Sequence, residues 1–262
     1  MGKLCFILGA GGARGISHVG FLQAMEENGI KPDCIAGCSM GSIVGACYAK
    51  GVKPKEMRKI VEELKLSDIA DAFIFPFNKK SLLRSVKMRK KIENVIGMDT
   101  TFDSLEIPFE CIATDIVSGE VFVYKEGSVV EGVCASSAIP SVFHPVEKDG
   151  KVLVDGATLM PLPFICVNDF NPDIVVVVDV LGDLKTYESK KGLLNHLLRV
   201  VDVNSLYLSS VHLKEYNYDL LIKPELKDMS QYKVENLQFA YDCGYKAGLE
   251  NVEKIKKLLE KK

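Results

Sequence analysis

A serine lies between two glycines in the segment Gly37-Cys38-Ser39-Met40-Gly41. The segment follows a short apolar run at 33–36 and precedes a stretch of helical character that continues to about residue 50. Gly-x-Ser-x-Gly between a strand and a helix is typical of a nucleophile elbow, a strained turn that small neighbouring residues permit. The pattern predicts that this turn exposes the Ser39 hydroxyl as a nucleophile; the alternative is an incidental glycine-rich turn.

A second glycine-rich segment could supply hydrogen-bond donors to the oxyanion that such a serine generates. Gly11-Gly12-Ala13-Arg14-Gly15 follows the apolar run at 3–8 and opens a helix. Backbone N–H groups at a helix N-terminus form a fixed anion site. The competing interpretation is a dinucleotide-binding loop that starts at Gly9. That pattern would place Arg14 at its third glycine, and no acidic residue ends a second strand about 20 residues later.

A base is also required, because a free serine hydroxyl is a poor nucleophile. None of the four histidines has the sequence context of a triad histidine: His18, His144, His196 and His212. An aspartate at the exit of an apolar strand is a better candidate, and Asp155, Asp115 and Asp179 all have that position. Spacing alone leaves the choice among them open, since such an aspartate can also cap a turn.

Alternating strands and helices must position these segments. We expect strands at 3–8, 33–36, 109–115, 120–125, 151–154, 173–181 and 218–222. We expect further helices over 54–98, with an interruption at 73–77, and over 128–137, 189–213 and the C-terminal stretch. The run at 175–178 is four valines, which is typical of a central strand buried on both faces. The pattern predicts an α/β fold with a central, mostly parallel sheet flanked by helices, organised as a single domain over residues 1–262.

Composition excludes several classes of function. The chain has 262 residues and a net charge of -2, so it has no general attraction for nucleic acid. No apolar run approaches the roughly 18 residues that cross a bilayer. A signal peptide is not expected because Arg14 interrupts the first apolar run, and myristoylation is not expected because Phe6 stands where Ser or Thr is required.

The eight cysteines contain no Cys-x-x-Cys pair and no zinc-like spacing. Most lie within apolar stretches, which predicts reduced, buried thiols and a cytoplasmic protein. We expect no metal and no cofactor, since the sequence also offers no calcium loop.

Taken together, these segments resemble the patatin-like phospholipase family. The resemblance includes Leu8 to Leu22 with its glycine loop, the serine turn, Ala113-Thr114-Asp115, Ala135 to Pro140, and Asp155-Gly156-Ala157. It covers about residues 4–164 in order, and the last hundred residues carry no matching motif. One departure is Ala10, where the family usually has glycine.

The resemblance implies a three-layer fold and a Ser-Asp dyad without a catalytic histidine, with Ser39 as nucleophile and Asp155 as base. It implies an oxyanion hole from the backbones of Gly11, Gly12 and Ala13. The residues that would support these motifs are Arg14, Gly15, Gly37, Gly41 and Gly156. Arg14 either has a structural role or contacts a phosphate.

The activity implied is hydrolysis of acyl esters in phospholipids or lysophospholipids. Two alternatives remain: a general carboxylesterase or acyltransferase with the same dyad, and a non-catalytic module that binds lipid or nucleotide. A lipid surface is the expected contact for Phe73, Phe75 and Phe77 and the basic run Lys79–Lys91, which would make the protein peripheral to a membrane. Without the resemblance, a packed loop and a solvated helix face would be the simpler interpretation of this segment.

Overall fold

The computed structural model describes residues 2–62, 86–140, 142–183, 192–233 and 235–262. Within them one sheet of eight strands forms the centre of the molecule. The strands are β1 (Leu4–Leu8), β2 (Cys34–Cys38), β3 (Phe109–Asp115), β4 (Glu120–Tyr124), β5 (Val146–Lys148), β6 (Lys151–Asp155), β7 (Ile174–Val178) and β8 (Leu220–Ile222). Hydrogen-bonded neighbours follow the path β5-β6-β3-β2-β1-β7-β8, in which β6 and β2 pair with successive stretches of β3, and β4 pairs with β3 outside this path.

The sheet is mixed but mostly parallel. β1 pairs in parallel with both β2 and β7, β2 with β3, and β7 with β8. The antiparallel pairs are β3–β4, β3–β6 and β5–β6. The carboxyl ends of β1, β2, β3 and β7 therefore share one edge of the sheet, where α/β folds place their ligands. The predicted fold class is confirmed.

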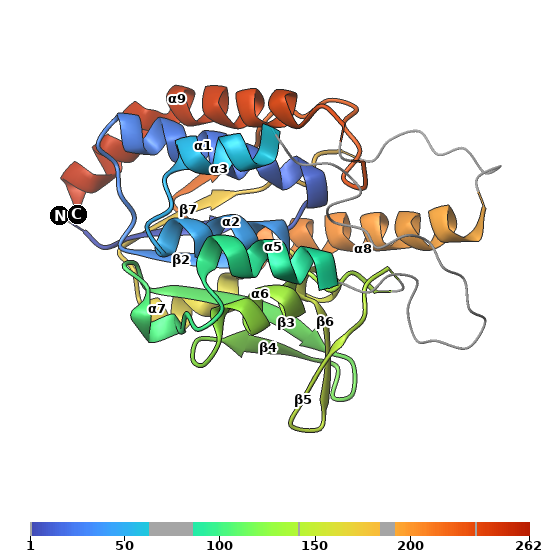
Figure 1. Cartoon of the computed structure of the whole chain (residues 1–262). Helices are drawn as coiled ribbons and strands as arrows, with labels where there is room; N and C mark the ends of the chain where they lie inside the picture. The colour runs from blue at the N-terminus through green and yellow to red at the C-terminus, as the bar shows by residue number, and fades with distance from the viewer. Residues whose placement is uncertain (1, 63–85, 141, 184–191, 234) are drawn as a thin grey trace.

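Helices cover both faces of the sheet (Figure 1). They are α1 (Ser17–Glu27), α2 (Met40–Ala49), α3 (Pro54–Glu62), α5 (Val86–Ile96), α6 (Val129–Ser136), α7 (Val167–Phe170), α8 (Leu193–Glu215) and α9 (Leu237–Lys261). Alternate residues of β1 point to opposite sides, because successive side chains of a strand do so. Leu4, Phe6 and Leu8 join the core beneath α1, α2 and α9. Cys5 and Ile7 join a smaller core on the other face.

Small residues allow α9 to lie directly along α1 (Figure 1). A Cβ on Gly20 of α1 would lie 2.0 Å from the carbonyl oxygen of Tyr241, and one on Gly244 of α9 would lie 1.8 Å from that of Ser17. These glycines therefore set the close approach of the first and last helices, which cover β1 and its neighbours.

The structure differs from the sequence-based prediction in a few elements. β5 was not predicted, although Asp149-Gly150 between β5 and β6 is a strong hairpin signal, and both residues have positive φ, 48° and 78°. Within the stretch expected to be helical over 54–98, α3 and α5 are described. Residues Phe73, Phe75, Phe77 and the first part of the basic run Lys79–Lys91 lie outside the described residues.

Candidate active site

Two strand ends meet on one side of β3. β2 runs parallel to β3 and its last pair joins Cys38 to Ile112, whereas β6 runs antiparallel and its last pair joins Asp155 to Ala113. β4 pairs with residues 111–115 along the opposite side of β3, so β2 and β6 must share the remaining side. The two strands therefore end against each other, and Ser39, the residue after Cys38, lies beside Asp155.

Ser39 has a strained backbone conformation, with φ 54° and ψ −122°. Its N–H donates to Oγ of Ser136 at 3.0 Å, and its carbonyl oxygen accepts from Oγ of Ser42 at 2.6 Å. The flanking glycines make room for the turn. A Cβ on Gly37 would lie 2.6 Å from Cα of Ser42, and one on Gly41 would lie 2.1 Å from a carbonyl oxygen of β1.

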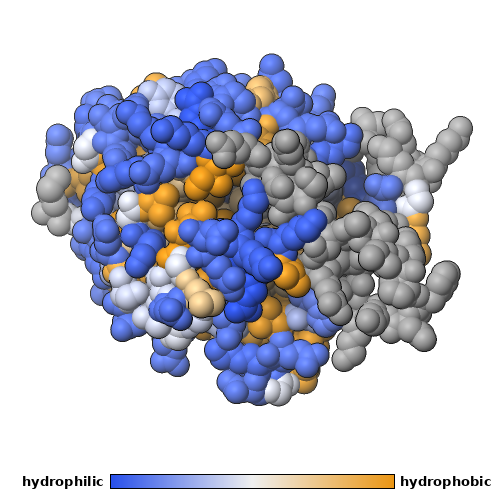
Figure 2. All heavy atoms as spheres, viewed as in Figure 1, coloured by the Kyte–Doolittle hydropathy of each residue, from blue (hydrophilic) through white to orange (hydrophobic). Residues whose placement is uncertain are grey.

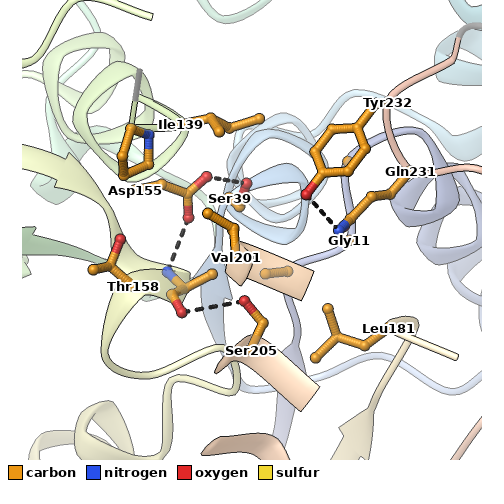
Figure 3. Close-up of a pocket in the computed structure, with 14 residues that line it drawn as sticks. Gly11, Ser39, Ile139, Asp155, Thr158, Leu181, Val201, Ser205, Gln231 and Tyr232 are labelled. Atoms are coloured by element: carbon orange, nitrogen blue, oxygen red, sulfur yellow. Dashed lines mark hydrogen bonds between the residues drawn. The ribbon is translucent and has the colours of Figure 1, made fainter. Parts of the chain in front are cut away.

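The hydroxyl of Ser39 donates a 2.6 Å hydrogen bond to Oδ2 of Asp155. The other carboxylate oxygen, Oδ1, accepts from the N–H of Ala157 at 2.9 Å, which fixes the orientation of the carboxylate toward the serine (Figure 3). Burial raises the pKa of Asp155 to about 6, against the lowering effect of these two hydrogen bonds. The chain turns away at Gly156, where a Cβ would lie 2.6 Å from the carbonyl oxygen of Ile112.

The two rival aspartates have other partners. Asp115 accepts from the N–H groups of Val117 and Val152, both at 3.1 Å, and from the hydroxyl of Ser118 at 2.9 Å. Burial raises its pKa, but these bonds and the charge of Lys151 outweigh burial and lower it overall. It is therefore a turn-capping carboxylate.

The Asp179 carboxylate has three partners. It accepts from the N–H of Leu181 and the hydroxyl of Ser209, both at 3.1 Å, and pairs with Nζ of Lys223 at 3.2 Å. Of the three aspartates that the sequence left open, only Asp155 is hydrogen-bonded to Ser39 within the described residues.

No histidine in the described ranges is hydrogen-bonded to Ser39 or Asp155. Nε2–H of the fully buried His18 donates to the carbonyl oxygen of Gly9 at 2.8 Å, and burial lowers the His18 pKa to about 4. His18 is therefore neutral near pH 7 and supports the end of β1 beside the glycine loop.

The glycine loop lies next to Ser39 in the same pocket. Gly11 and Gly12 line that pocket, and the described residues provide no acceptor for either amide. Ala13 differs, because its N–H donates to the carbonyl oxygen of Gln231 at 2.9 Å. The expectation that Ala13 contributes to the oxyanion hole is therefore not met in this conformation, whereas Gly11 and Gly12 remain free to donate.

Arg14 holds the glycine loop against two other segments. Its Nε donates to the carbonyl oxygen of Met229 at 2.8 Å, and its Nη1 donates to that of Leu181. The side chain is buried, and burial lowers its pKa. Of the two roles considered for Arg14, these contacts support the structural one. The adjacent Gly15 is needed because a Cβ there would lie 2.5 Å from Cγ of Met40.

The pocket over the dyad is narrow, about 30 Å³, which holds about two water molecules. Its outer wall comes from the part of the chain without a recognisable motif: Val201 and Ser205 of α8, and Gln231 and Tyr232 from the loop before α9 (Figure 3). Under this cover Ser39 is only 5% exposed. The prediction of an exposed hydroxyl is therefore wrong for this conformation, since α8 and the loop close over the turn.

A separate apolar groove of about 140 Å³ lies between α1, α2, α3 and α5. Its walls include Val19, Ile43, Met57 and Ile92, and hydrophobic atoms can be seen along it in Figure 2. Met40, the residue after Ser39, contributes to its lining.

Three further observations concern metal ligands, cysteine thiols and membrane-spanning helices. Among the residues that the structure describes, no group of three or more His, Cys, Asp or Glu side chains is arranged to hold a metal ion. All eight cysteines are free thiols, seven of them buried. In the described ranges, no helix combines the length and the apolar character needed to cross a bilayer.

Comparison with known proteins agrees with this arrangement. A family model described as patatin-like phospholipase matches residues 6–165. An uncharacterized NTE family protein of Mycobacterium tuberculosis is 33% identical over 180 residues, which are 69% of this chain and 49% of that protein. The protein named lysophospholipase NTE1 of Cryptococcus neoformans is 32% identical over 187 residues, which cover 68% of this chain and 11% of that protein.

The chain thus spans about half the length of the mycobacterial relative and a small part of the fungal one. Among solved structures, VipD from Legionella pneumophila superposes with a TM-score of 0.60 at 16% identity, over 97% of this chain and 67% of VipD. That likeness supports the fold alone. The family model covers more than half of the chain and includes both Ser39 and Asp155. The chain belongs to the patatin-like phospholipase family.

Proposed function

We propose that this chain hydrolyses carboxylic esters of phospholipids or lysophospholipids through a Ser39–Asp155 dyad. The observation that carries the proposal is the 2.6 Å hydrogen bond from Ser39 Oγ to a buried carboxylate whose pKa is raised to about 6. A carboxylate with that pKa is ionised at pH 7 and is a stronger base than an ordinary aspartate. It can therefore accept the proton of the nucleophile without a histidine.

In the first half of the reaction, Ser39 Oγ attacks the ester carbonyl carbon while its proton passes to Asp155. The carbonyl electron pair moves to oxygen, and the N–H groups of Gly11 and Gly12 stabilise the resulting oxyanion. When the carbonyl re-forms, the bond to the alkoxide leaving group breaks. The leaving group takes the proton from Asp155, which leaves an acyl-serine.

In the second half, water attacks the acyl-serine carbonyl and gives a proton to Asp155. A second tetrahedral intermediate uses the same two amides. Its collapse breaks the bond to Ser39 Oγ, which recovers its proton, and releases the fatty acid. The two carboxylate oxygens keep the same roles in both steps. Oδ2 exchanges the proton, and Oδ1 is held by the N–H of Ala157.

The lipid class of the substrate is supported by membership of a phospholipase family and by a relative that is named a lysophospholipase. A general carboxylesterase or an acyltransferase would use the same dyad and differ only in leaving group or acceptor. A non-catalytic lipid- or nucleotide-binding module would retain the glycine loop but would not need a base at Asp155.

Two assays test the proposal. A fluorophosphonate probe should label the wild-type protein and not Ser39→Ala. Purified protein should release fatty acid from phosphatidylcholine or lysophosphatidylcholine faster than from a neutral ester of equal chain length. Equal rates on the three esters would favour a general carboxylesterase. Absence of labelling in folded wild-type protein would leave the binding module as the better interpretation.

A further inference from the structure

One side of α8 exposes a row of large apolar side chains. Leu193, Leu197, Val200, Val203 and Tyr207 are 75%, 43%, 66%, 45% and 66% exposed. Their spacings of four, three, three and four residues place them on one face of the helix, since side chains three and four apart are neighbours. We call these five residues the α8 apolar face. Half of the ten large apolar side chains exposed in the described part of the chain belong to it.

The neighbouring side of the same helix covers the dyad. Val201 and Ser205 line the pocket that holds Ser39 and Asp155, and Ser205 Oγ lies 3.5 Å from the carbonyl oxygen of Ala157. A surface that receives the α8 apolar face would therefore lie one helix diameter, about 10 Å, from the pocket.

The two ends of α8 are held differently. At its C-terminal end Leu213 packs on the smaller core, and the following Tyr216 stacks on Phe164 with ring centroids 5.0 Å apart. Among the described residues of α8 before Leu213, none packs on either hydrophobic core, and at mid-helix Asn204 Nδ2 donates to the carbonyl oxygen of Thr158 at 3.0 Å. This N-terminal half extends beyond the sheet in Figure 1. The α8 apolar face is thus carried on the more projecting part of the helix.

The size of the face argues against a second copy of this chain as its occupant. A stable protein–protein interface buries about 800 Å² on each partner and involves about 20–30 residues a side. Five side chains on one helix fall well short of that. A single amphipathic helix face is, however, sufficient for a lipid surface, where the apolar side enters the boundary between head groups and acyl chains.

The charges nearby also suit a lipid surface. Lys87 and Lys90 are exposed in the first turns of α5, and that end of the helix points to the same side of the molecule as the N-terminal half of α8 (Figure 1). Lys233, in the loop that covers the pocket, is 67% exposed and lies 3.9 Å from the Glu235 carboxylate, so its charge is partly compensated. Cations on the same side of the molecule as an apolar face strengthen its attraction to anionic head groups.

We infer that the α8 apolar face docks the protein on a lipid surface, and that this places the dyad pocket at the surface from which its substrate comes. The inference rests on the proposed function for the identity of the substrate, but the docking itself needs no chemistry. It also assigns the contact to α8, independently of the segment Phe73–Phe77 that the sequence suggested.

The test measures binding of the full chain to vesicles of ether-linked phosphatidylcholine with a minority of ether-linked phosphatidylglycerol, lipids that an ester hydrolase cannot cleave. We expect Leu197→Ser/Val200→Ser to lower the partition coefficient about tenfold, because two partly exposed apolar side chains no longer enter the lipid. The matched control is Met98→Ser/Leu249→Ser, whose residues have nearly the same exposures, 66% and 44%, and lie outside α8. It should bind within about twofold of wild type.

Hydrolysis of a short soluble ester is measured in parallel and should change by less than about twofold in both variants, since neither touches the pocket. Val203→Ser/Tyr207→Ser repeats the test at the other end of the face. The inference is overturned if the α8 variants bind vesicles as well as wild type does. It is also overturned if the control variant loses as much vesicle binding as they do. A wild-type dimer that Leu197→Ser/Val200→Ser dissociates, with vesicle binding unchanged, would assign the face to self-association. Failure of the proposed function would appear separately, as soluble-ester hydrolysis that survives Ser39→Ala.

Discussion

Ser39 Oγ lies 2.6 Å from Oδ2 of Asp155 because β2 and β6 approach each other from opposite directions along β3 and stop one residue pair apart. Both side chains are thus placed at strand ends, since Asp155 closes β6 and Ser39 directly follows β2. Strand-borne groups are held more precisely than loop-borne groups. The geometry explains why 116 residues can separate a nucleophile from its base without loss of alignment.

The first prediction concerns which aspartate acts as the base. Asp155→Asn should lower kcat for a soluble ester by about 100-fold or more, because an amide cannot accept the Ser39 proton. Asp115→Asn is the matched control, since Asp115 also ends a strand but bonds only to its own turn and to β6. Its kcat should stay within about threefold of wild type. Severe loss in Asp115→Asn with near-normal Asp155→Asn would transfer the base to Asp115.

The second prediction is a pH profile. Because burial raises the pKa of Asp155 to about 6, kcat/KM for a soluble ester should rise about tenfold per pH unit below pH 6 and level off above it. The neighbouring Cys38 thiol and Tyr232 phenol have pKa values raised by burial, so both stay neutral in this range. The profile is measured from pH 4.5 to 8, about one to two units on either side of the pKa. A rate that is already level at pH 5 would contradict the raised pKa.

The third prediction follows from the same pKa shift. The folded protein binds a proton at Asp155 more tightly than the unfolded chain does, since burial moves the pKa from the ordinary aspartate value of 3.8 to about 6. The stability that Asp155 contributes is therefore present below about pH 4 and lost as pH rises to about 6. Asp155→Asn carries no charge to bury. The free energy of unfolding of Asp155→Asn minus that of wild type should therefore increase by up to about 3 kcal/mol from pH 4 to pH 7.

Denaturant unfolding of both proteins at the two pH values measures this difference. If the difference in free energy of unfolding between the two proteins does not change with pH, the fold stabilises the ionised Asp155 carboxylate as well as water does. Such a result would weaken its assignment as a base, because a stabilised carboxylate is a poor proton acceptor.

Much of this arrangement can be predicted from the sequence. The apolar run at 3–8 and the four valines at 175–178 mark the central strands, and Gly37 to Gly41 marks the turn that carries Ser39. The glycine loop and its place at the end of β1 were also predicted. These features are local, so a short stretch of sequence contains the information that specifies them.

The features that sequence did not reveal depend on distant contacts. Spacing alone did not separate Asp155 from Asp115 and Asp179; the family resemblance pointed to Asp155, and the meeting of β2 and β6 is the geometric reason that it is the one beside Ser39. Likewise, no local pattern indicates that Gln231 accepts from Ala13, or that α8 closes the pocket. The spacing of apolar residues at 193, 197, 200 and 207 was a signal that could have identified the exposed face of α8.

The fourth prediction tests the glycine loop with a matched pair. Gly12 has φ 52°, and a Cβ there would lie 2.2 Å from the carbonyl oxygen of Gln231, so Gly12→Ala must displace the loop or the segment that holds it. Gly29 also has positive φ, 71°, but nothing lies within 4 Å of its Cβ position. Gly29→Ala should lose about 1 kcal/mol of stability from backbone strain, and Gly12→Ala should lose more because its Cβ also meets the carbonyl oxygen of Gln231. Only Gly12→Ala should lose activity, by about 100-fold in kcat, as expected when oxyanion donors move.

Thermal unfolding and soluble-ester kinetics separate the two effects. The oxyanion assignment fails if Gly12→Ala turns over the ester as fast as Gly29→Ala does. Helical circular dichroism equal to that of wild type shows that Gly12→Ala is folded, so that its activity loss belongs to the displaced loop.

The last prediction distinguishes a dyad from a conventional triad. In a Ser-His-Asp enzyme, removal of the histidine lowers the rate by several orders of magnitude. Here the Ser39 hydroxyl is already bonded to Asp155, so no histidine should be indispensable as a proton carrier. His196→Gln and His212→Gln replace the two histidines that follow Asp155 in sequence, the order that α/β-hydrolases require. Both should retain kcat within about fivefold of wild type.

The other two histidines should act through structure. His18 is buried and its Nε2–H supports the carbonyl of Gly9, so His18→Gln should lower activity by disturbing the glycine loop while the Ser39–Asp155 pair remains intact. His144 contacts the carbonyl oxygen of the adjacent Pro145 at 3.3 Å, and its replacement should have a small local effect. Turnover of a soluble ester by the four Gln variants, with folding checked by circular dichroism, decides the matter. A folded His196→Gln or His212→Gln protein as inactive as Ser39→Ala would replace the dyad by a triad, and Asp155 would then orient a histidine instead of accepting the proton itself.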